Sequence, residues 1–415
     1  MPSSDRRTRT AAAIALLPAT ALLLSACASG GAASPAPSSA GASVAPVSNG
    51  VSKVAIELVS GDSGDECTVS SSTAKAGPVT FSVTNTSATG ITEVELLQGQ
   101  RIVGEKENLA PGLAAVSFTS TLTGGTYSVY CPGATTEATA FTVTGKAPDS
   151  SGSTASTLLT TGTKTYGEYV TSTLGDMVTA VRGLQTAVES GDLAAAKKQY
   201  ALARPFYEKV ESDVEGFVLP GTDPTDNAGN LDYLIDMRAS NLDPAVGWSG
   251  FHAVERDLWK AGKITDGTKK YASDLTANVE KLVDLAKTLT YKPEDLANGA
   301  AGLLEEVQSG KITGEEEAYS HLDLVDFAAN IEGAQQAFAN LQPGMQKIDP
   351  TLTQQVADRF TAVTDALTKY QDPSQAGGYE LYTAEVRAKD AAALASTVQS
   401  LQEPLSRIAE KVATA

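Results

Sequence analysis

The sequence is poor in the side chains that bind soft metals or serve as nucleophiles. Its 415 residues include only 2 His, 3 Cys, 4 Met and 2 Trp. Basic residues are also in the minority, with 31 Lys and Arg against 49 Asp and Glu, so the formal net charge is −18. Binding to nucleic acid requires clustered Lys and Arg, and this balance argues against it. An acidic chain with 42% hydrophobic residues is instead typical of a globular protein that attracts cations.

An apolar run follows several arginines at the N-terminus. Residues 1–26 have the charged start and the short apolar stretch of a secretory signal peptide. They end in Leu-Ser-Ala before Cys27, a pattern that resembles a bacterial lipobox. The resemblance implies that Cys27 is lipidated and that the protein is exported to the cell envelope, anchored to the outer face of the cytoplasmic membrane or periplasmic. A plain secretory signal followed by a chance cysteine is the alternative.

The rest of the chain divides by composition and periodicity. Residues 27–52 are rich in Ala, Ser, Gly and Pro, which predicts a flexible tether. Residues 53–145 contain short alternating runs rich in Val, Thr and aromatics, which predict a β-sandwich. After a second linker at 146–157, residues 158–415 show helical periodicity, which predicts an all-α bundle. The predicted fold class is therefore multidomain β plus α.

Both histidines lie in the helical region, among carboxylates. On a helix, His252 and Glu255 share one face, so an imidazole and a carboxylate can converge on one cation. The second histidine, His321, precedes Asp323. Histidines and carboxylates that project inward from facing helices are the ligands of iron sites in helical bundles. A structural histidine that only makes hydrogen bonds is the alternative for each.

An acidic stripe precedes the first histidine in the sequence. Glu208, Glu211 and Glu215 are spaced i, i+3 and i+7, so they lie on one side of a helix. Such a stripe offers oxygen ligands to a cation, but it is also typical of a solvated helix face.

Three blocks of the helical region resemble the imelysin-like family. The block GFHAVERDLW resembles its GxHxxE signature, and YEKVESDVEGF and YSHLDLVDFAANIEGAQQAF resemble two further blocks of its iron-uptake branch. This family is also classed among metallopeptidases, and its members are helical bundles with a metal site at the HxxE helix. The resemblance implies that His252 and Glu255 are metal ligands, followed in rank by Glu211, Glu208 and Asp323.

The residues argue against peptidase activity. A zinc peptidase of the common type uses HExxH, with two histidines one turn apart and a glutamate base, whereas Ala253 follows His252 here. A centre rich in carboxylates and poor in imidazole favours hard cations such as Fe(III). We therefore expect a metal-binding protein and not an enzyme. An HxxE metallopeptidase and an envelope scaffold lipoprotein without metal are the alternatives.

The β region holds the two remaining cysteines, Cys67 and Cys131. Residues 28–150 contain no His and no Met, which excludes a blue-copper centre. The runs EKENLAPG and GTYSVYC resemble the cupredoxin-like N-terminal domain of EfeO-type iron-uptake proteins. A metal site of Cys67, Glu95 and Cys131 is one interpretation. A disulfide between the two cysteines, in an oxidising compartment, is the other.

Together the resemblances imply an EfeO-like iron-uptake lipoprotein. Its cargo would be Fe(III) or Fe(II), with copper or zinc as further candidates. Its implied partners are a membrane iron permease, to which it would deliver iron, and an exported haem-dependent peroxidase.

Overall fold

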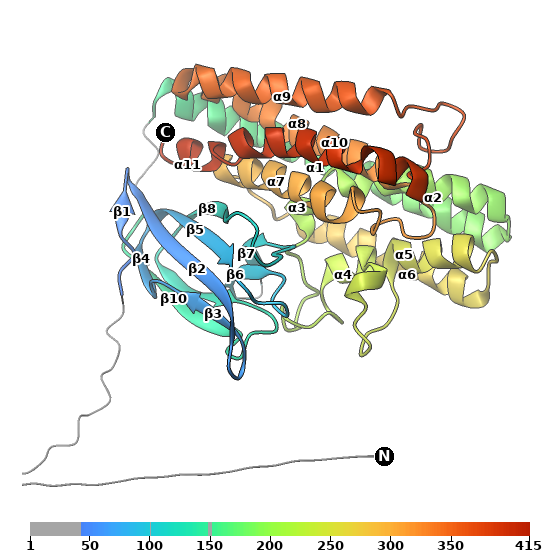
Figure 1. Ribbon diagram of the computed structural model, residues 1–415, viewed down its shortest axis with the longest axis horizontal. Coiled ribbons are helices and arrows are strands. Elements are labelled where there is room, and N and C mark those ends of the chain that lie inside the picture. The colour runs from blue at the N-terminus through green and yellow to red at the C-terminus, as the bar shows by residue number, and fades with distance from the viewer. Residues whose placement is uncertain (1–42, 100, 148–151) are drawn as a thin grey trace, which may run out of the picture. The chain divides into compact units, whose positions relative to one another are not determined.

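The computed structural model describes residues 43–99, 101–147 and 152–415. In this part of the chain a two-sheet β domain precedes an all-helical domain, which confirms the predicted fold class (Figure 1). The predicted signal peptide, the predicted lipidation site at Cys27 and most of the predicted tether lie outside the described residues. No helix in the described ranges has both the length and the apolar character needed to span a membrane.

The β domain is a sandwich of two sheets. One sheet has the strand order β1-β2-β5-β8 with β3 also paired to β2, and the other has the order β4-β10-β9-β6-β7. Neighbouring strands are antiparallel except for the pairs β2–β5 and β4–β10. The strands are β1 (Val47–Ser48), β2 (Val51–Gly61), β3 (Gly64–Val69), β4 (Thr73–Lys75), β5 (Gly77–Asn85), β6 (Val94–Gln98), β7 (Arg101–Lys106), β8 (Val116–Leu122), β9 (Gly125–Tyr130) and β10 (Ala138–Thr144).

Alternation of side chains builds the core of the sandwich. Val54, Ile56 and Leu58 of β2 are buried, while the residues between them face outward. The predicted boundary at residue 53 is late, because β1 and the first residues of β2 fall in the range assigned to the tether. The reason is visible at Val51, which is fully buried, so these last residues before 53 already contribute apolar side chains to the fold.

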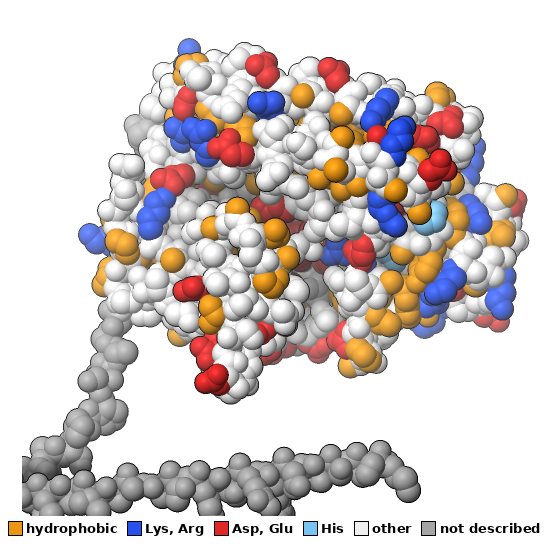
Figure 2. Space-filling view, viewed as in Figure 1, with side chains coloured by type: hydrophobic (Ala, Val, Ile, Leu, Met, Phe, Trp, Pro, Cys, Tyr) orange, Lys and Arg blue, Asp and Glu red, His pale blue; other side chains and the backbone are white. Residues whose placement is uncertain are grey.

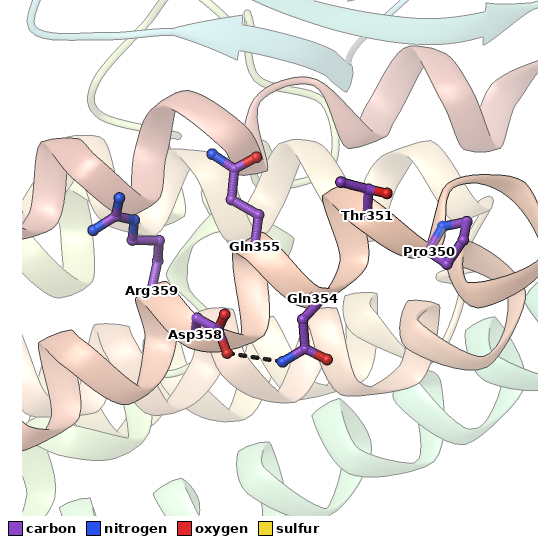
Figure 3. A pocket seen from close by; sticks show the side chains of 6 residues that line it. All are labelled: Pro350, Thr351, Gln354, Gln355, Asp358 and Arg359. Atoms are coloured by element: carbon purple, nitrogen blue, oxygen red, sulfur yellow. Dashed lines mark hydrogen bonds between the residues drawn. The ribbon is translucent and has the colours of Figure 1, made fainter.

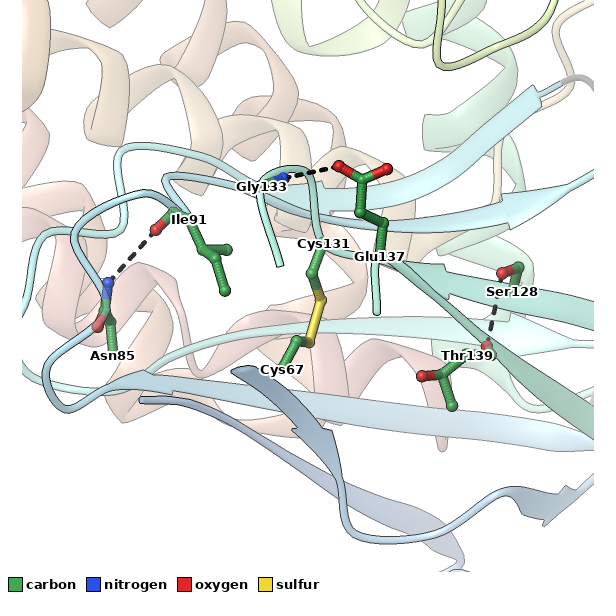
Figure 4. The surroundings of a disulfide bond; sticks show 8 residues. All are labelled: Cys67, Asn85, Ile91, Ser128, Cys131, Gly133, Glu137 and Thr139. Carbon is green, nitrogen blue, oxygen red and sulfur yellow. Dashed lines mark hydrogen bonds between the residues drawn. A yellow bond between two sulfur atoms is a disulfide. The ribbon is translucent and has the colours of Figure 1, made fainter. Parts of the chain in front are cut away.

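A disulfide joins the two sheets. Cys67 lies in β3 and Cys131 directly follows β9, with the two Cα atoms 6.4 Å apart (Figure 4). Of the two interpretations of these cysteines, the structure contains the disulfide. A metal site built on their thiolates is therefore not formed, because both sulfurs are used in the S–S bond.

The helical domain contains seven long helices and several short ones in the described residues. They are α1 (Thr154–Ser190), α2 (Leu193–Glu208), α3 (Glu211–Val214), α4 (Leu231–Asp236), α5 (Gly250–Glu255), α6 (Asp266–Ala286), α7 (Pro293–Glu306), α8 (Asp323–Ile348), α9 (Pro350–Thr368), α10 (Ala384–Leu405) and α11 (Ile408–Ala413). Helix α1 packs against α2, α6 and α8, and α8 also contacts α7 and α9. Two π-helical turns, Arg256–Lys260 and Val307–Lys311, directly continue α5 and α7.

Local sequence sets the helix ends. The hydroxyl of Ser153 accepts a hydrogen bond from the third residue of α1, which therefore begins inside the predicted linker. Gly191 ends α1 in the left-handed region, and the Asp192 side chain caps α2. Pro293 occupies the first turn of α7, as its sequence pattern predicts.

Charged side chains are scattered over the visible surface and do not gather into one large patch (Figure 2). An open depression lies at the start of α9, where Gln354 donates a hydrogen bond to Asp358 over 2.8 Å (Figure 3). Its other lining residues are Pro350, Thr351, Gln355 and Arg359. This depression has one carboxylate and no histidine, so it offers no metal-binding chemistry. The ionisable groups of interest are inside the helical domain.

Candidate metal centre

The end of α4 and the start of α5 bring the first two ligand candidates together. Asp236 is the last residue of α4, and His252 is the third residue of α5. They meet because Gly250 opens α5 directly against the α4 backbone: a Cβ on Gly250 would lie 2.0 Å from the carbonyl oxygen of Ile235. Gly250 also has φ +68°, which favours glycine. The glycine of the GxHxxE block therefore has a structural role, since any side chain would push α5 away from Asp236.

His252 lies among four carboxylates. Its Nδ1 is 3.2 Å from an oxygen of Glu255 and 4.0 Å from one of Glu317. Its Nε2 is 3.6 Å from Asp236 and 3.5 Å from Glu316. The imidazole is only 1% exposed, and in the described part of the chain Nε2 has no hydrogen-bond partner. Both ring nitrogens thus face carboxylate oxygens in a closed interior.

Backbone and side-chain donors fix two of these carboxylates. Glu255 accepts hydrogen bonds from the backbone N–H groups of Tyr319 and Ser320, each over 2.7 Å. Glu317 accepts one from the Tyr200 hydroxyl over 2.8 Å and another from the Ser320 hydroxyl. The loop before α8 is therefore tied to the HxxE helix through the oxygens that surround His252.

Two buried cations balance part of the acidic charge. Arg204 of α2 is completely buried and contacts five carboxylates, with Glu317 at 3.0 Å. The other four are Glu208, Asp236, Glu316 and Asp326. Lys311, at the end of a π-helical turn, lies 3.1 Å from Glu208 and 3.4 Å from Glu316. Buried charges are tolerated only when they are paired. Without a metal, Arg204 and Lys311 therefore hold the buried carboxylates together.

The pKa values show the strength of these interactions. Burial lowers the pKa of His252, but its contacts with Glu255 and Glu316 raise it to well above the ordinary value. Burial and then Glu255 raise the pKa of Glu317 to about 8, and burial raises that of Asp236 to about 7. Burial also favours the neutral form of Glu316, yet Lys311 and Arg238 bring its pKa well below the usual range. The ionisation of these carboxyl groups therefore depends on burial, on the neighbouring carboxylates and on the cations beside them.

The geometry offers two sets of three ligand atoms, both centred on His252. One set is Asp236, His252 and Glu316, and the other is His252, Glu255 and Glu317; within each, the atoms lie within 4.8 Å of one another. One imidazole nitrogen can bind a cation while the other donates its N–H to a carboxylate, which is the usual way a metal-bound histidine is oriented. The mixture of one imidazole and several carboxylates suits a hard or intermediate cation such as iron.

The structure treats the five predicted helical-domain residues differently. His252 and Glu255 belong to one ligand set. Glu208 and Glu211 lie inside the protein, as near neighbours of Lys311, and so do not form a solvated face. Asp323 accepts a hydrogen bond from the backbone N–H of Glu317 over 3.2 Å and so supports the centre from outside both sets.

Sequence reasoning missed Asp236, Glu316 and Glu317. The two glutamates lie in the run GEEEAYS, a few residues before His321 and outside the three blocks that carry the family resemblance, whereas Asp323 lies inside one of those blocks. His321 itself is in neither ligand set. Asp236 carried no signal, because a single aspartate at the end of a short helix is an ordinary surface pattern.

In the β domain, Glu95 has no thiolate of Cys67 or Cys131 with which to share a metal, because both sulfurs are in the disulfide. It lies in β6, paired across the ladder with Glu105 of β7 and Tyr130 of β9. Burial, followed by Glu105 and Glu93, raises its pKa to about 9. The residue predicted to share a site with Cys67 and Cys131 is therefore grouped with other carboxylates.

Fold and site together define a class: a two-domain protein whose helical domain encloses a centre of one imidazole and several carboxylates suited to a metal ion. The family model described as Peptidase_M75: Imelysin matches residues 162–408. The chain belongs to this imelysin family and, within it, to the Efem/EfeO family lipoproteins. Relatives with that description from Staphylococcus aureus strains MRSA252 and NCTC 8325 are each 38% identical over 250 residues, covering 60% of this chain and 83% of the relative.

Two solved structures are also similar. An iron-regulated protein A precursor from Parabacteroides distasonis ATCC 8503 is 17% identical, with 64% of this chain and 98% of that chain covered and a TM-score of 0.48. Reduced rusticyanin is 16% identical, with 23% of this chain and 79% of that chain covered and a TM-score of 0.20. These scores are too low to establish a shared fold, so the architecture rests on the structure itself.

Proposed function

We propose that this protein is the cell-envelope iron-binding component of an iron-uptake system. The observation that carries the proposal is His252, whose two ring nitrogens face four buried carboxylates. Membership of the Efem/EfeO lipoproteins supports iron as the cargo and a membrane-anchored location. Iron enters as Fe(III), or as Fe(II) before oxidation, and its ligands come from His252 and the surrounding carboxylates. The oxygen-rich ligand set supports iron over copper and zinc.

The protein has two partners and is not an enzyme. A lipid anchor at Cys27 holds it at the membrane, where it delivers iron to a membrane permease and works with an exported haem-dependent peroxidase. The family description contains the word peptidase, but His252 and Glu255 are each 1% exposed. A peptide bond needs access to a metal and to a base, so this burial supports sequestration over hydrolysis.

The test is a titration of the purified full-length mature protein with Fe(III) supplied as its nitrilotriacetate complex. Glu255→Gln keeps an oxygen for the backbone donors of Tyr319 and Ser320 but removes the carboxylate charge beside His252. We expect iron affinity to fall by about 10–100-fold, the usual effect of losing a ligand or its oriented partner. Asp236→Asn tests the other side of the imidazole in the same way.

The matched control is Glu385→Gln, which removes the same charge from an exposed helix position. It should bind iron like the wild type. If Glu255→Gln and Asp236→Asn both keep wild-type affinity, His252 is not the iron centre. Casein hydrolysis that requires iron or zinc and disappears in His252→Ala would instead support the peptidase alternative.

A further inference from the structure

A tyrosine hydroxyl contacts one of the carboxylates around His252. Tyr200 of α2 is fully buried, and its hydroxyl donates a hydrogen bond to Oε1 of Glu317 over 2.8 Å. The same carboxylate oxygen lies 4.0 Å from Nδ1 of His252. A phenol whose hydroxyl already points its proton at a carboxylate can lose an electron and that proton together. Tyr200 is therefore placed to exchange electrons with a metal ion held at His252.

The ring of Tyr200 contacts one of the 2 Trp side chains of the protein. Trp259 lies in the π-helical turn that continues α5, and α2 contacts both α5 and this turn. The ring centroids of Tyr200 and Trp259 are 5.3 Å apart and the ring planes are at 65° to each other, which is an edge contact. Whereas Tyr200 is fully buried, Trp259 is only partly buried. Two side chains that can each give up one electron thus lead from the buried centre to the protein surface.

A small cavity borders the centre at the other ring nitrogen of His252. The cavity has a volume of about 30 Å³, and its lining includes Asp236, which lies 3.6 Å from Nε2 of His252. A water molecule needs roughly 10–15 Å³ of such space, so the cavity has room for about two oxygen atoms. Hydrogen peroxide is of this size. A small oxidant can therefore approach a metal ion on the Asp236 side, while Tyr200 contacts the centre on the Glu317 side.

We propose that Tyr200 and Trp259 form an electron relay between iron at His252 and the protein surface, and that the relay protects the protein from hydrogen peroxide. Fe(II) gives peroxide a single electron, and the product is a hydroxyl radical that attacks the nearest side chains. A second electron from Tyr200 converts the peroxide to water instead. The inference rests on the proposed function, because the first electron comes from Fe(II) carried at His252.

Peroxide takes two electrons in this step, one from Fe(II) and one from Tyr200. Its O–O bond breaks, and two protons, the phenolic proton of Tyr200 and one from solvent, complete two water molecules. Fe(III) and a tyrosyl radical remain. The tyrosyl radical takes an electron from Trp259 and regains a proton through Glu317. The Lys197 ammonium lies 5.0 Å from the centre of the indole ring and disfavours a positive charge there, so Trp259 gives its N–H proton to solvent. A small thiol then reduces the tryptophan radical at the surface, and the relay acts once for each Fe(II) oxidised.

The experiment uses the full-length mature protein, loaded with Fe(II) without oxygen and freed of unbound iron. It is mixed with hydrogen peroxide and frozen, and its radicals are recorded by electron paramagnetic resonance. The wild type should show a tryptophan radical. Trp259→Phe should lose that signal and stop at a tyrosyl radical. Tyr200→Phe keeps the ring and leaves Glu317 its hydrogen bond from Ser320, but it should lose both signals, and mass spectrometry should find more oxidised side chains beside His252.

Two controls match these variants. Trp248→Phe replaces the other tryptophan, and Tyr207→Phe alters another fully buried tyrosine of α2, whose hydroxyl bonds to Asp232, a residue in neither ligand set. Both should form the radical of the wild type. All proteins are compared at equal iron loading, and the loading is measured first. A wild type that binds no iron would overturn the proposed function and the relay with it. Iron-loaded wild type without a radical, or an equal radical yield in Tyr200→Phe, would overturn the relay alone.

Discussion

Arg204→Met should strongly destabilise the metal-free helical domain. Arg204 has no exposed surface and contacts five carboxylates, so the change leaves buried negative charges without their main partner. Breaking a buried ion pair from one side costs roughly 3–5 kcal/mol. In a domain of this size each kcal/mol lowers the melting temperature by about 2–4 °C, so we expect a fall of about 6–20 °C.

The assay is calorimetric unfolding in the presence of a chelator, with Arg182→Met as the matched control. Arg182 pairs with Glu280, but the two side chains are 62% and 44% exposed. An exposed pair contributes only about 0–1 kcal/mol, so the control should melt close to the wild type. Iron should stabilise Arg204→Met more than it stabilises the wild type, because the metal then supplies the missing positive charge. A melting temperature of Arg204→Met within about 2 °C of the control would correspond to a loss of no more than about 1 kcal/mol and would refute the reasoning.

Two further predictions concern the β domain. A carboxyl group whose pKa rises on folding keeps its proton to a higher pH in the folded state than in the unfolded state. Folding raises the pKa of Glu95 from 4.5 to about 9, so the metal-free domain should lose stability as the pH rises between these two values. The loss for this one group is at most about 1.4 kcal/mol per pH unit. Glu95→Gln should flatten this dependence in chelator-treated urea melts between pH 5.5 and 8.5, and an unchanged slope would contradict the assigned pKa. Reduction of Cys67–Cys131 should destabilise the domain by about 2–4 kcal/mol, since the bond constrains residues 64 apart in the chain. A thiol count on the unfolded, unreduced protein checks it: two free thiols from these cysteines would mean that the bond does not form.

The fold could be predicted because its signals are local. Alternating residues such as Val54, Ile56 and Leu58 identify a half-buried strand without any knowledge of its partners. The helix ends at Gly191 and Pro293 follow from backbone preferences of single residues. The sequence predicts too late a start for the β domain because an Ala- and Ser-rich segment is typical of a linker, although buried Ala45 and Val51 already belong to the core of the sandwich.

The candidate site was predictable only where its residues are neighbours in sequence. His252 and Glu255 are one helical turn apart, so their shared face follows from helix geometry alone. Asp236, Glu316 and Glu317 reach His252 through tertiary packing, including the close approach of Gly250 to Ile235. The sequence predicts the acidic stripe at Glu208 and Glu211 but not its surroundings, because single basic residues such as Arg204 and Lys311 are typical of a surface and only the packing of the helices buries them.

The buried ion pairs around His252 bear on how the iron carrier that we propose would load and release its cargo. Arg204 and Lys311 already form ion pairs with the carboxylates around His252. An arriving cation must therefore break these ion pairs or share the carboxylates with the two side chains. This competition lowers the net gain on binding, because part of the attraction between carboxylates and metal is spent on breaking existing ion pairs. It also stabilises the centre after the metal leaves, since the two side chains can pair again with the freed oxygens. If the protein carries iron as we propose, Arg204 and Lys311 can pair again with Glu208 and Glu316 when the metal leaves, which supplies a physical basis for release without unfolding.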